Sequence, residues 1–471
     1  MRYVSTRGQA PELDFVGAML AGLARDGGLY VPVSWPSLDA KAIAALAGRP
    51  YAEVAVEVMR PFVGDSIAEA DLARMAREAY GSFRHPATAP LVQLGDNLFV
   101  LELFHGPTLA FKDLAMQLVS RLMDHVLQKR GERTTIVVAT SGDTGGAAVE
   151  AFRGREQVDV VVLYPHGRIS DVQRRMMTSA PDNNVHALAI EGNFDDCQAL
   201  VKAMFNHHAF RDRVRLSGVN SINWARVLAQ VVYYFTAAVA LGAPHRKIAF
   251  TVPTGNFGDV YAGYVASKMG LPTDRLVVAT NVNDILVRTL ATGDYEIRDV
   301  TATTSPSMDI QISSNFERLL FETCGRDAQK VRGLMGSLAQ SRRFSVPPDA
   351  LKQIRALFTA DRASEQESAA TIRAWMKEAG YCADPHTAVA LAVAEKEHRD
   401  PAVPMVVLST AHPAKVPDAV AAACGVTPAL PDWLADLPKR KERVTVLPAD
   451  QAQVEKFVLS ASRAAREGVS A

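Results

Sequence analysis

A lysine and an aspartate stand together where a helix is predicted to begin. The stretch HGPTLAFKD, residues 105–113, contains a Gly-Pro turn followed by Thr108, which we expect to cap a helix that continues to about Gln128. Lys112 and Asp113 then lie in the first turn, where the helix dipole favours the carboxylate and disfavours the ammonium. Burial and the dipole would lower the pKa of Lys112, and a neutral amine attacks carbonyls or serves as a base. The alternative is a solvated lysine beside Asp113, since most lysines are solvated.

Two glycine-rich turns have the composition of anion-binding sites. Each follows an apolar run and opens onto a helical pattern: SGDTGGAAVEAF (141–152) and PTGNFGDVYAGYVA (253–266). Small residues let the backbone approach a ligand closely, and successive N–H groups at the start of a helix attract anions. Neither turn has the spacing of a P-loop or of the dinucleotide-binding fingerprint. Each could be a tight turn without a ligand, but the two together favour a ligand, or a pair of ligands, with two anionic groups.

A third turn adds hydroxyl groups. LSTAHPAKV (408–416) follows the last apolar run and presents Ser409 and Thr410 at its end. In open parallel sheets ligands bind where strands end and helices begin, so we expect the three turns to meet. An amine, anion-binding turns and a strand-end hydroxyl together are typical of a pyridoxal phosphate pocket. Residue type and spacing alone do not name a reaction.

The elements that would position these turns alternate between strands and helices. Apolar, β-branched runs are nearly continuous and precede helical patterns, which indicates a mostly parallel sheet covered on both faces. The runs lie at 98–103, 135–140, 159–164, 185–190, 247–252, 275–280 and 404–409. The intervals after Ile190 and after Thr280 are too long for single crossovers, so we expect two α/β lobes or large insertions.

Helices are predicted on either side of this pattern. The first hundred residues look mostly helical, with proline-bearing turns between the pieces. Residues 325–398 have the pattern of charged amphipathic helices, the last of which is capped by Asp384 and begun by Pro385. The segment 427–471 is polar and punctuated by proline, and we expect it to wrap the outside of the molecule.

The composition restricts the classes of partner. The 471 residues are 48% hydrophobic and include 51 basic and 51 acidic side chains, so zero net charge gives no reason to expect nucleic acid or an anionic membrane. The apolar stretch 227–243 contains Gln230 and Thr236, which favours a buried helix over a membrane span. The four cysteines are far apart and lack metal-ligand spacing, so free thiols and no metal are expected. No apolar signal segment opens the sequence, and we expect a cytoplasmic protein.

Six motifs, in order along the chain, closely resemble those of the threonine synthase family in its longer bacterial and fungal form. They are HGPTLAFKD, TSGDTGG, NSINWARVLAQ, PTGNFGD, MDIQISSNFERLLF and LSTAHPAK, and the resemblance extends from YVSTRG at the start over essentially the whole chain. It implies an α/β protein with the fold-type-II architecture of pyridoxal phosphate enzymes, which is like that of the tryptophan synthase β chain. It also implies conversion of O-phospho-L-homoserine and water to L-threonine and phosphate, by γ-elimination and β-addition of water.

The resemblance divides the chain into three parts. We expect a mainly helical N-terminal domain of the threonine synthase type over residues 1–95, and a cofactor-binding core of two α/β lobes with mostly parallel sheets over 96–425. The smaller lobe is expected at roughly 115–220, with the cofactor in the cleft between the lobes. The remaining residues, 426–471, are expected to form an extension that packs on the core. A monomer or a homodimer is expected.

The resemblance assigns residues to the cofactor, pyridoxal 5'-phosphate. Lys112 is expected to form the Schiff base, and Thr410 to meet the pyridine nitrogen, where a hydroxyl gives a milder electron sink than a carboxylate. The residues implied for the cofactor phosphate are Gly255, Asn256, Phe257 and Gly258. The residues implied for the substrate carboxylate and the cofactor's hydroxyl edge are Thr140, Ser141, Gly142, Asp143 and Thr144.

The SSNFER segment resembles the family's substrate-phosphate site. The candidates there are Ser314, Asn315 and Arg318. A guanidinium group matches phosphate in a bidentate way, which favours the arginine. The alternative is a surface helix arginine paired with Glu317 or Glu322. Asn220 and Asn223 of NSINWAR could lie nearby, although Asn223 is equally suited to cap a helix.

Other functions fit part of the same pattern. A related fold-type-II enzyme, such as threonine dehydratase or cysteine synthase, would lack the SSNFER segment and the long N-terminal domain. A non-catalytic threonine-synthase-like protein would bind the cofactor or a phospho-ligand without turnover, but the intact Lys112 and Thr410 argue against it. A dinucleotide-binding dehydrogenase would need GxGxxG with an acidic residue beyond it, which the sequence lacks.

Overall fold

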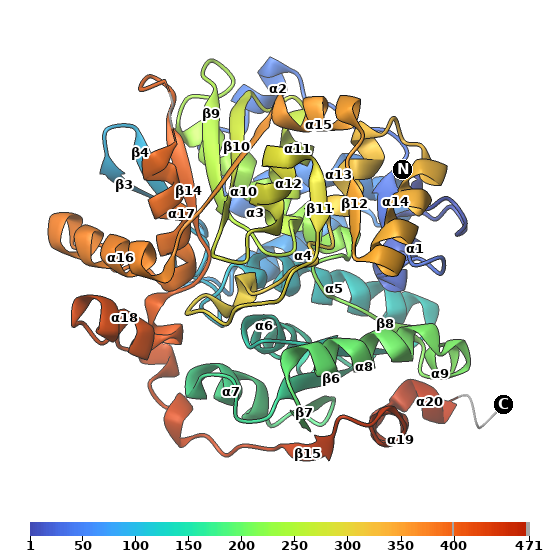
Figure 1. The fold of residues 1–471 in the computed structure, drawn as a ribbon. Helices are drawn as coiled ribbons and strands as arrows, with labels where there is room; N and C mark the ends of the chain where they lie inside the picture. The colour runs from blue at the N-terminus through green and yellow to red at the C-terminus, as the bar shows by residue number, and fades with distance from the viewer. Residues whose placement is uncertain (398–399, 468–471) are drawn as a thin grey trace.

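Two largely parallel sheets form the centre of the molecule (Figure 1). The computed structural model describes residues 1–397 and 400–467. The larger sheet has the strand order β13 (Phe358–Arg362), β10 (Thr273–Thr280), β9 (Ile248–Pro253), β14 (Met405–Ser409), β4 (Leu98–Glu102) and β3 (Leu91–Gly95). The smaller sheet has the order β15 (Thr445–Pro448), β7 (Val185–Glu191), β6 (Val158–Pro165), β5 (Thr134–Ala139) and β8 (Leu216–Ser217). Among these described strands, only β3 and β4 pair antiparallel.

Helices cover both faces of the sheets, and the strands are apolar for that reason. Every residue of β5, β6 and β9 is buried, as expected for strands that contact helices on both sides. The helices along the smaller sheet are α6 (Asp143–Phe152), α7 (Asp171–Thr178), α8 (Phe194–Asn206) and α9 (His208–Arg213). Those nearer the larger sheet are α5 (Lys112–Arg130), α10 (Trp224–Ala240), α11 (Gly258–Lys268), α12 (Ile285–Thr292), α17 (Pro385–Lys396) and α18 (Pro417–Cys424).

The N-terminal region packs its helices against the central ones. It contains β1 (Tyr3–Ser5), β2 (Tyr30–Pro32), α1 (Phe15–Ala21), α2 (Ala40–Ala44), α3 (Tyr51–Val63) and α4 (Glu69–Tyr80), which confirms the helical character predicted for it. A further group follows α12 and consists of β11 (Asp294–Glu296), α13 (Phe316–Thr323), α14 (Ala328–Ser341), β12 (Arg343–Ser345), α15 (Pro348–Arg355) and α16 (Glu365–Ala379). The apolar side chains of the N-terminal region and of the larger sheet share one core.

The predicted strands and the predicted buried helix are confirmed. Each of the seven apolar runs contains a strand of one of the two sheets. The apolar stretch 227–243 lies largely in α10, which packs against α3, α5 and α11. All residues of α10 are buried except Thr236 and Ala240. Within the described residues, no helix combines the length and the apolar character needed to cross a membrane. As predicted, Asp384 caps α17 and Pro385 begins it.

Two local predictions are wrong. Thr108 does not cap a helix, because α5 begins at Lys112, and the N–H and hydroxyl of Thr108 instead donate to the Asp113 carboxylate at 2.7 Å each. The segment 325–398 is not helical throughout, because residues 358–362 form β13 at the edge of the larger sheet. Its sequence, FTADR, has a charged, partly exposed end and little apolar alternation, so periodicity could not reveal it. His398, the last residue predicted in this segment, lies outside the described residues.

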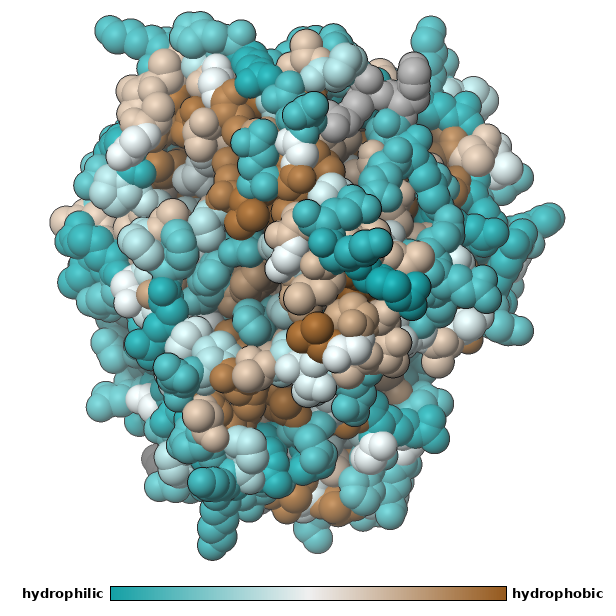
Figure 2. Space-filling view, turned by 90° about the vertical axis from the view of Figure 1, so that its left-hand side faces the viewer, coloured by the Kyte–Doolittle hydropathy of each residue, from teal (hydrophilic) through white to brown (hydrophobic). Residues whose placement is uncertain are grey.

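The surface is mixed in character. On the face drawn in Figure 2, hydrophilic residues predominate and hydrophobic ones form separate small areas. The large hydrophobic side chains that are exposed in the described chain come from distant segments: Val33, Val300, Ile312, Val444 and Val446. Scattered apolar side chains of this kind are ordinary on protein surfaces.

The C-terminal segment completes the smaller sheet. Strand β15 pairs with β7 in parallel, and α19 (Gln451–Ala461) packs against α8, so the segment runs along the outer side of this sheet (Figure 1). The last described helix is α20 (Arg463–Glu467), next to β5. Residues 468–471, which belong to the predicted C-terminal extension, lie outside the described residues.

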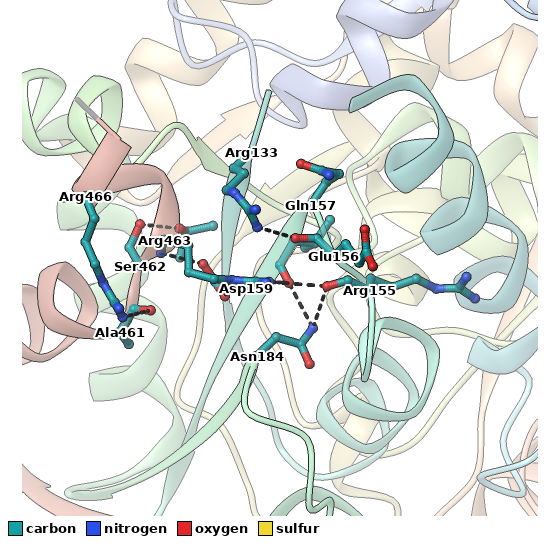
Figure 3. Close-up of polar contacts among 12 residues, drawn as sticks. Arg133, Arg155, Glu156, Gln157, Asp159, Asn184, Ala461, Ser462, Arg463 and Arg466 are labelled. Carbon is teal, nitrogen blue, oxygen red and sulfur yellow. Dashed lines mark hydrogen bonds and ion pairs between the residues drawn. The ribbon is translucent and has the colours of Figure 1, made fainter. Parts of the chain in front are cut away.

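Arg463 anchors this end of the chain (Figure 3). Its backbone N–H and its Nε donate to the two carboxylate oxygens of Asp159 on β6, each at 2.7 Å. Its Nη2 donates to the carbonyls of Arg155 and Val158 at 3.2 and 3.0 Å. Asp159 is only 1% exposed, so its charge depends on this partner.

We predict that Arg463→Ala loosens the C-terminal segment. Loss of the guanidinium leaves the buried Asp159 carboxylate unpaired, which should lower the free energy of unfolding by about 2 kcal/mol, allowing for the partial exposure of the arginine. Urea unfolding and limited proteolysis would measure the change. The control is Arg466→Ala, because among the described residues Arg466 donates to the nearby carbonyls of Ser460 and Ala461 and to no carboxylate (Figure 3). Equal stability of the two variants would contradict the anchoring role.

Candidate active site

A cavity lies between the two sheets, where strands of both of them end. The residues that line it follow β5 of the smaller sheet and β9 and β14 of the larger sheet, so the three turns of the sequence analysis meet as expected. The first group of lining residues is Ala139, Thr140, Ser141 and Thr144, and the second is Pro253 to Asp259 with Thr410. Other lining residues that could contact a ligand through polar atoms are Lys112, Gln198, Asn220, Ser221, Arg226, Gln230 and His386.

A short backbone pairing places Lys112 beside Thr410. The N–H of Phe111 donates to the carbonyl of Thr410 at 2.8 Å, and the N–H of His412 donates to the carbonyl of Leu109 at 3.0 Å. Leu109 has a φ of 61°, an uncommon value for a residue with a side chain, and it turns the chain into α5. Lys112, the first residue of α5, is thereby held at the end of β14.

The amine of Lys112 is buried and has a lowered pKa. The side chain is 8% exposed, and within the described residues its ammonium has no hydrogen-bond partner; it lies 4.8 Å from the centre of the Phe111 ring. Burial is the largest cause that lowers the pKa, to about 8, and the positive charges of Arg226 and Lys415 act in the same direction. Asp143 and Asp259 partly oppose the shift. The lowered pKa predicted from the sequence is confirmed.

The turn that precedes α11 has free N–H groups. The backbone N–H groups of residues 255–257 donate no hydrogen bond to any described residue. Phe257 has a φ of 64° and is packed against Phe316, and a Cβ on Gly255 would lie 2.6 Å from the carbonyl oxygen of Ser307. The backbone is therefore fixed in a conformation that points several donors at the cavity, at the positive end of α11. A phosphate group fits such a site.

The turn after β5 divides into two parts. Thr140, Ser141 and Thr144 line the cavity, but Gly142 and Asp143 do not. The Thr140 hydroxyl oxygen accepts hydrogen bonds from the N–H groups of Gly142 and of Gly145, both at 2.9 Å, and so fixes the turn. The hydroxyls of Ser141 and Thr144 are left for a ligand.

Asp143 belongs to a buried ion pair that sequence reasoning missed. Its Oδ1 lies 2.8 Å from Nζ of Lys415, and the same ammonium donates to the carbonyl of Thr108 at 2.8 Å. Burial alone would raise the pKa of Asp143, but the positive charges of Lys415 and Lys112 outweigh it and hold that pKa well below its usual range. Lys415 lies in LSTAHPAK, and its type gave no sign that it would be 1% exposed.

The structure does not bring the predicted substrate-phosphate residues into the cavity. Ser314, Asn315 and Arg318 are absent from its lining. Arg318 is fully buried, and its guanidinium donates to the carbonyls of Tyr30 and Ile222 and to the side-chain oxygen of Asn315. Asn315 in turn donates to the carbonyls of Asn256 and Ser221 at 3.0 and 3.1 Å. These contacts engage all three guanidinium nitrogens of Arg318 within the protein.

Arg226 is the guanidinium group that lines the cavity. It lies on α10, is 2% exposed, and donates through Nη1 to the carbonyl of Val219 at 3.0 Å, whereas its buried Nε has no partner within the described residues. Its place in NSINWAR was a signal that sequence reasoning did not use. Asn223 of the same motif caps α10 by accepting the N–H of Ala225, and its amide nitrogen donates to the carbonyls of Met19 and Gly218. Asn220 lines the cavity.

Several buried polar atoms in the cavity wall have no partner in the described chain. They are Oδ1 of Asn220, Nε of Arg226, Oδ2 of Asp259 and Nε2 of His386. A buried polar atom without a partner costs about 1–3 kcal/mol, so such atoms are rare unless a ligand completes them. Nε of Arg226 and the free N–H groups at 255–257 can donate to anionic groups, whereas the two oxygens and the imidazole nitrogen need a donor, so the wall fits a polar ligand with both anionic groups and hydrogen-bond donors.

We predict that Lys112 reacts as a neutral amine at an unusually low pH. A lysine whose pKa is lowered to about 8 is neutral above that pH, so reductive methylation of the ligand-free protein by formaldehyde should rise as the pH increases through 8. Peptide mass spectrometry would measure the labelling, with Lys129, which is exposed on the same helix, as the internal reference. Labelling of Lys112 only in the pH range of the exposed amine would contradict the assignment.

Known proteins share both the sequence and this architecture. A family model described as "Pyridoxal-phosphate dependent enzyme" matches residues 84–410, and models described as "Threonine synthase N terminus" and "Threonine synthase, C-terminal" match 2–80 and 387–458. A threonine synthase from Pseudomonas aeruginosa is 54% identical over 459 residues, which are 97% of this chain and 98% of that protein.

Two solved structures extend the comparison. The crystal structure of a pyridoxal-phosphate-bound threonine synthase from Brucella melitensis is 62% identical, has a TM-score of 0.95, and is matched over 98% of this chain and 100% of that one. The threonine synthase from yeast is 39% identical with a TM-score of 0.92, over 98% of both chains. From the three matching family models and these relatives, which span nearly its whole length, the chain belongs to the threonine synthase family of pyridoxal-phosphate-dependent enzymes.

Proposed function

We propose that the protein converts O-phospho-L-homoserine and water to L-threonine and phosphate, with pyridoxal phosphate as its cofactor. One observation carries this proposal: a single cavity contains the buried amine of Lys112, the free N–H groups at 255–257 and the guanidinium of Arg226. The reaction needs an amine that exchanges protons and two sites for phosphate, one for the cofactor and one for the substrate. Membership of the threonine synthase family agrees with these requirements.

The cofactor fits the side of the cavity formed by the larger sheet. We assign its phosphate to the turn Gly255–Gly258, its aldehyde carbon to Lys112 and its ring nitrogen to the hydroxyl of Thr410, which is 6% exposed in the wall. When bound, pyridoxal phosphate withdraws electrons from the amino acid attached to it and so stabilises negative charge on the substrate's carbon atoms. Thr410 is a neutral partner for the ring nitrogen, and its position is fixed by the pairing with Phe111.

Lys112 is the residue that moves protons. With the substrate held by the cofactor, Nζ of Lys112 would be the group that accepts the Cα proton of the substrate and returns it later, and burial, which lowers the pKa of this amine, favours the neutral form that can do so. Asp143 and Lys415 neutralise each other beside it, so neither competes for this proton. The hydroxyls of Ser141 and Thr144, at the start of α6, are placed to hold the substrate carboxylate.

We assign the phosphate of the substrate to Arg226. Its unpartnered Nε and its charge suit an oxygen that gains negative charge as the Cγ–O bond breaks. Asn220 and Ser221 line the cavity close by in the sequence and add polar groups. Ser314, Asn315 and Arg318 then serve the site indirectly, since the Asn315 amide supports the turn at Asn256.

Two further statements rest on this function. A small-molecule substrate is the partner that the cavity suits, and we propose a monomer or a homodimer as the assembly. We also propose that the protein works in the cytoplasm, which agrees with its four free cysteines.

The function is tested by phosphate release from O-phospho-L-homoserine. Wild-type protein reconstituted with pyridoxal phosphate should release phosphate, form L-threonine and show a visible absorption band that borohydride removes. Lys112→Ala should lose both the turnover and the band, because no other amine lines the cavity in the described residues. Lys129→Ala, on the exposed side of the same helix, is the control and should keep both. Undiminished turnover by Lys112→Ala would refute the proposed role.

A band without phosphate release would favour a related fold-type-II enzyme or a non-catalytic binding protein. Serine and threonine as alternative substrates would separate these two cases, because a dehydratase forms a 2-oxo acid from them and a non-catalytic protein does not. Absence of the band in the reconstituted wild-type protein would contradict the cofactor assignment.

Arg226 and Arg318 are expected to fail in different ways. Arg226→Gln should lower kcat/KM for O-phospho-L-homoserine at least about tenfold, since charged hydrogen bonds to phosphate are lost, while the absorption band of the cofactor is retained. Arg318→Gln should chiefly lower the melting temperature, because it removes buried bonds to Tyr30 and Ile222. Activity assays and thermal unfolding of both variants would measure this. The reverse pattern would restore Arg318 as the substrate-phosphate ligand.

A further inference from the structure

His386 is a buried histidine with one free ring nitrogen in the cavity wall. It is the second residue of α17, is 6% exposed, and lines the cavity. Its Nε2 atom has no hydrogen-bond partner among the described residues. Neither the cofactor assignment nor the phosphate assignments above use it. A polar ring atom that is buried without a partner at a ligand cavity indicates that the ligand supplies the partner.

Asp384 fixes the orientation and the tautomer of this ring. Its Oδ2 lies 2.8 Å from Nδ1 of His386 and accepts the backbone N–H of the same residue at 3.0 Å. Its Oδ1 accepts the N–H and the hydroxyl of Thr387, and Asp384 itself is fully buried. A carboxylate only accepts hydrogen bonds, so Nδ1 carries the proton, and Nε2 of the neutral ring is an acceptor.

The same network reaches the end of β14. The hydroxyl of Thr387 lies 2.9 Å from the hydroxyl of Ser409, which is the residue before Thr410. His386 is thus tied to the strand end that holds the cofactor side of the cavity. Asp143 on α6 and Asp309 are carboxylates whose pKa a positive His386 would lower, so both lie within electrostatic reach of this ring.

We propose that His386 is a further ligand-contacting residue of this active site, whose Nε2 accepts a hydrogen bond from a proton-bearing oxygen or nitrogen of the bound molecule. The donor belongs either to the cofactor or to the amino-acid ligand, and both have such groups. Asp384 is the positioning residue that holds the proton on Nδ1 and orients the ring. The inference rests on the proposed function for the identity of the ligands, but the placement of Nε2 does not depend on it.

Two substitutions test the two ring nitrogens of His386 separately. The amide of His386→Asn can reach the place of Nδ1 and keep the bond to Asp384, but it leaves nothing at Nε2. The longer side chain of His386→Gln can place its amide oxygen near the position of Nε2 and supply an acceptor there. The control is His207→Asn, because the Nδ1 of His207 also lies 3.0 Å from a carboxylate, that of Glu455, on a half-exposed side chain outside the cavity lining.

Four measurements would be made on the full-length protein. Pyridoxal phosphate binding to the ligand-free protein and the absorption spectrum of the holoenzyme report on a donor in the cofactor. Binding of L-threonine to the holoenzyme reports on a donor in the amino-acid ligand, and the melting temperature of the ligand-free protein reports on packing. We expect His386→Asn to weaken the binding of one of the two ligands about tenfold. His386→Gln should recover part of that affinity, and His207→Asn should bind both ligands like the wild type.

Some outcomes identify which ligand carries the hydrogen-bond donor, and others overturn the proposal. Weaker pyridoxal phosphate binding or a shifted absorption band assigns the donor to the cofactor, whereas a change confined to L-threonine binding assigns it to the amino-acid ligand. Binding of both ligands within twofold of wild type in His386→Asn would overturn the inference. The inference would also be overturned if both His386 variants bind ligand weakly and a lowered melting temperature of the ligand-free protein accounts for the weaker binding. Failure of the wild type to release phosphate would sink the proposed function, while the binding measurements would still judge His386.

Discussion

Burial of charged side chains governs this active site. Lys112, Arg226 and Lys415 are each under a tenth exposed, and the carboxylates that oppose the lowered pKa of Lys112 are Asp143 and Asp259. Asp143 is committed to Lys415, and burial raises the pKa of Asp259 to about 6 against the lowering effect of two tyrosine hydroxyls. A buried charge is costly unless it has a partner, so Arg226, whose Nε has none within the described residues, favours an anionic ligand. Burial lowers the pKa of Lys112 most, and the positive charges of Arg226 and Lys415 lower it further.

The rigid parts around the cavity are connected through Arg318 rather than through the ligand. This guanidinium donates to the carbonyl of Tyr30 in β2, to the carbonyl of Ile222 before α10, and to the side chain of Asn315. Asn315 continues the connection to the phosphate-binding turn at Asn256. Three segments that are distant in the sequence are thus held at fixed spacing by one fully buried side chain. Precise spacing of this kind is what preorganises a site for a charged transition state.

Sequence reasoning identified the features that local chemistry determines. The seven apolar runs are strands and Lys112 begins a helix, because continuous apolar stretches and glycine turns act through their neighbours along the chain. It missed what depends on tertiary contacts. Arg318 and Arg226 both stand in apolar, helix-forming motifs, and only the packed fold turns one toward backbone carbonyls and the other toward the cavity. His386 stands beside Pro385 at a predicted helix start and belongs to none of the predicted site motifs, and Thr108 has the residue type of a helix cap, whereas its donation to Asp113 depends on the fold of the turn between them.

The strand order of the smaller sheet has a consequence for biosynthesis. Strand β7 (Val185–Glu191) has β6 on one side, but its other neighbour, β15 (Thr445–Pro448), is translated only after the entire larger sheet. Until then β7 is an open edge of apolar sequence, the kind of surface that pairs with other chains. The growing polypeptide therefore exposes an aggregation-prone strand edge until β15 has been made. Pairing of β15 with β7 closes that edge, and the docking of Arg463 on Asp159 holds the segment that closes it.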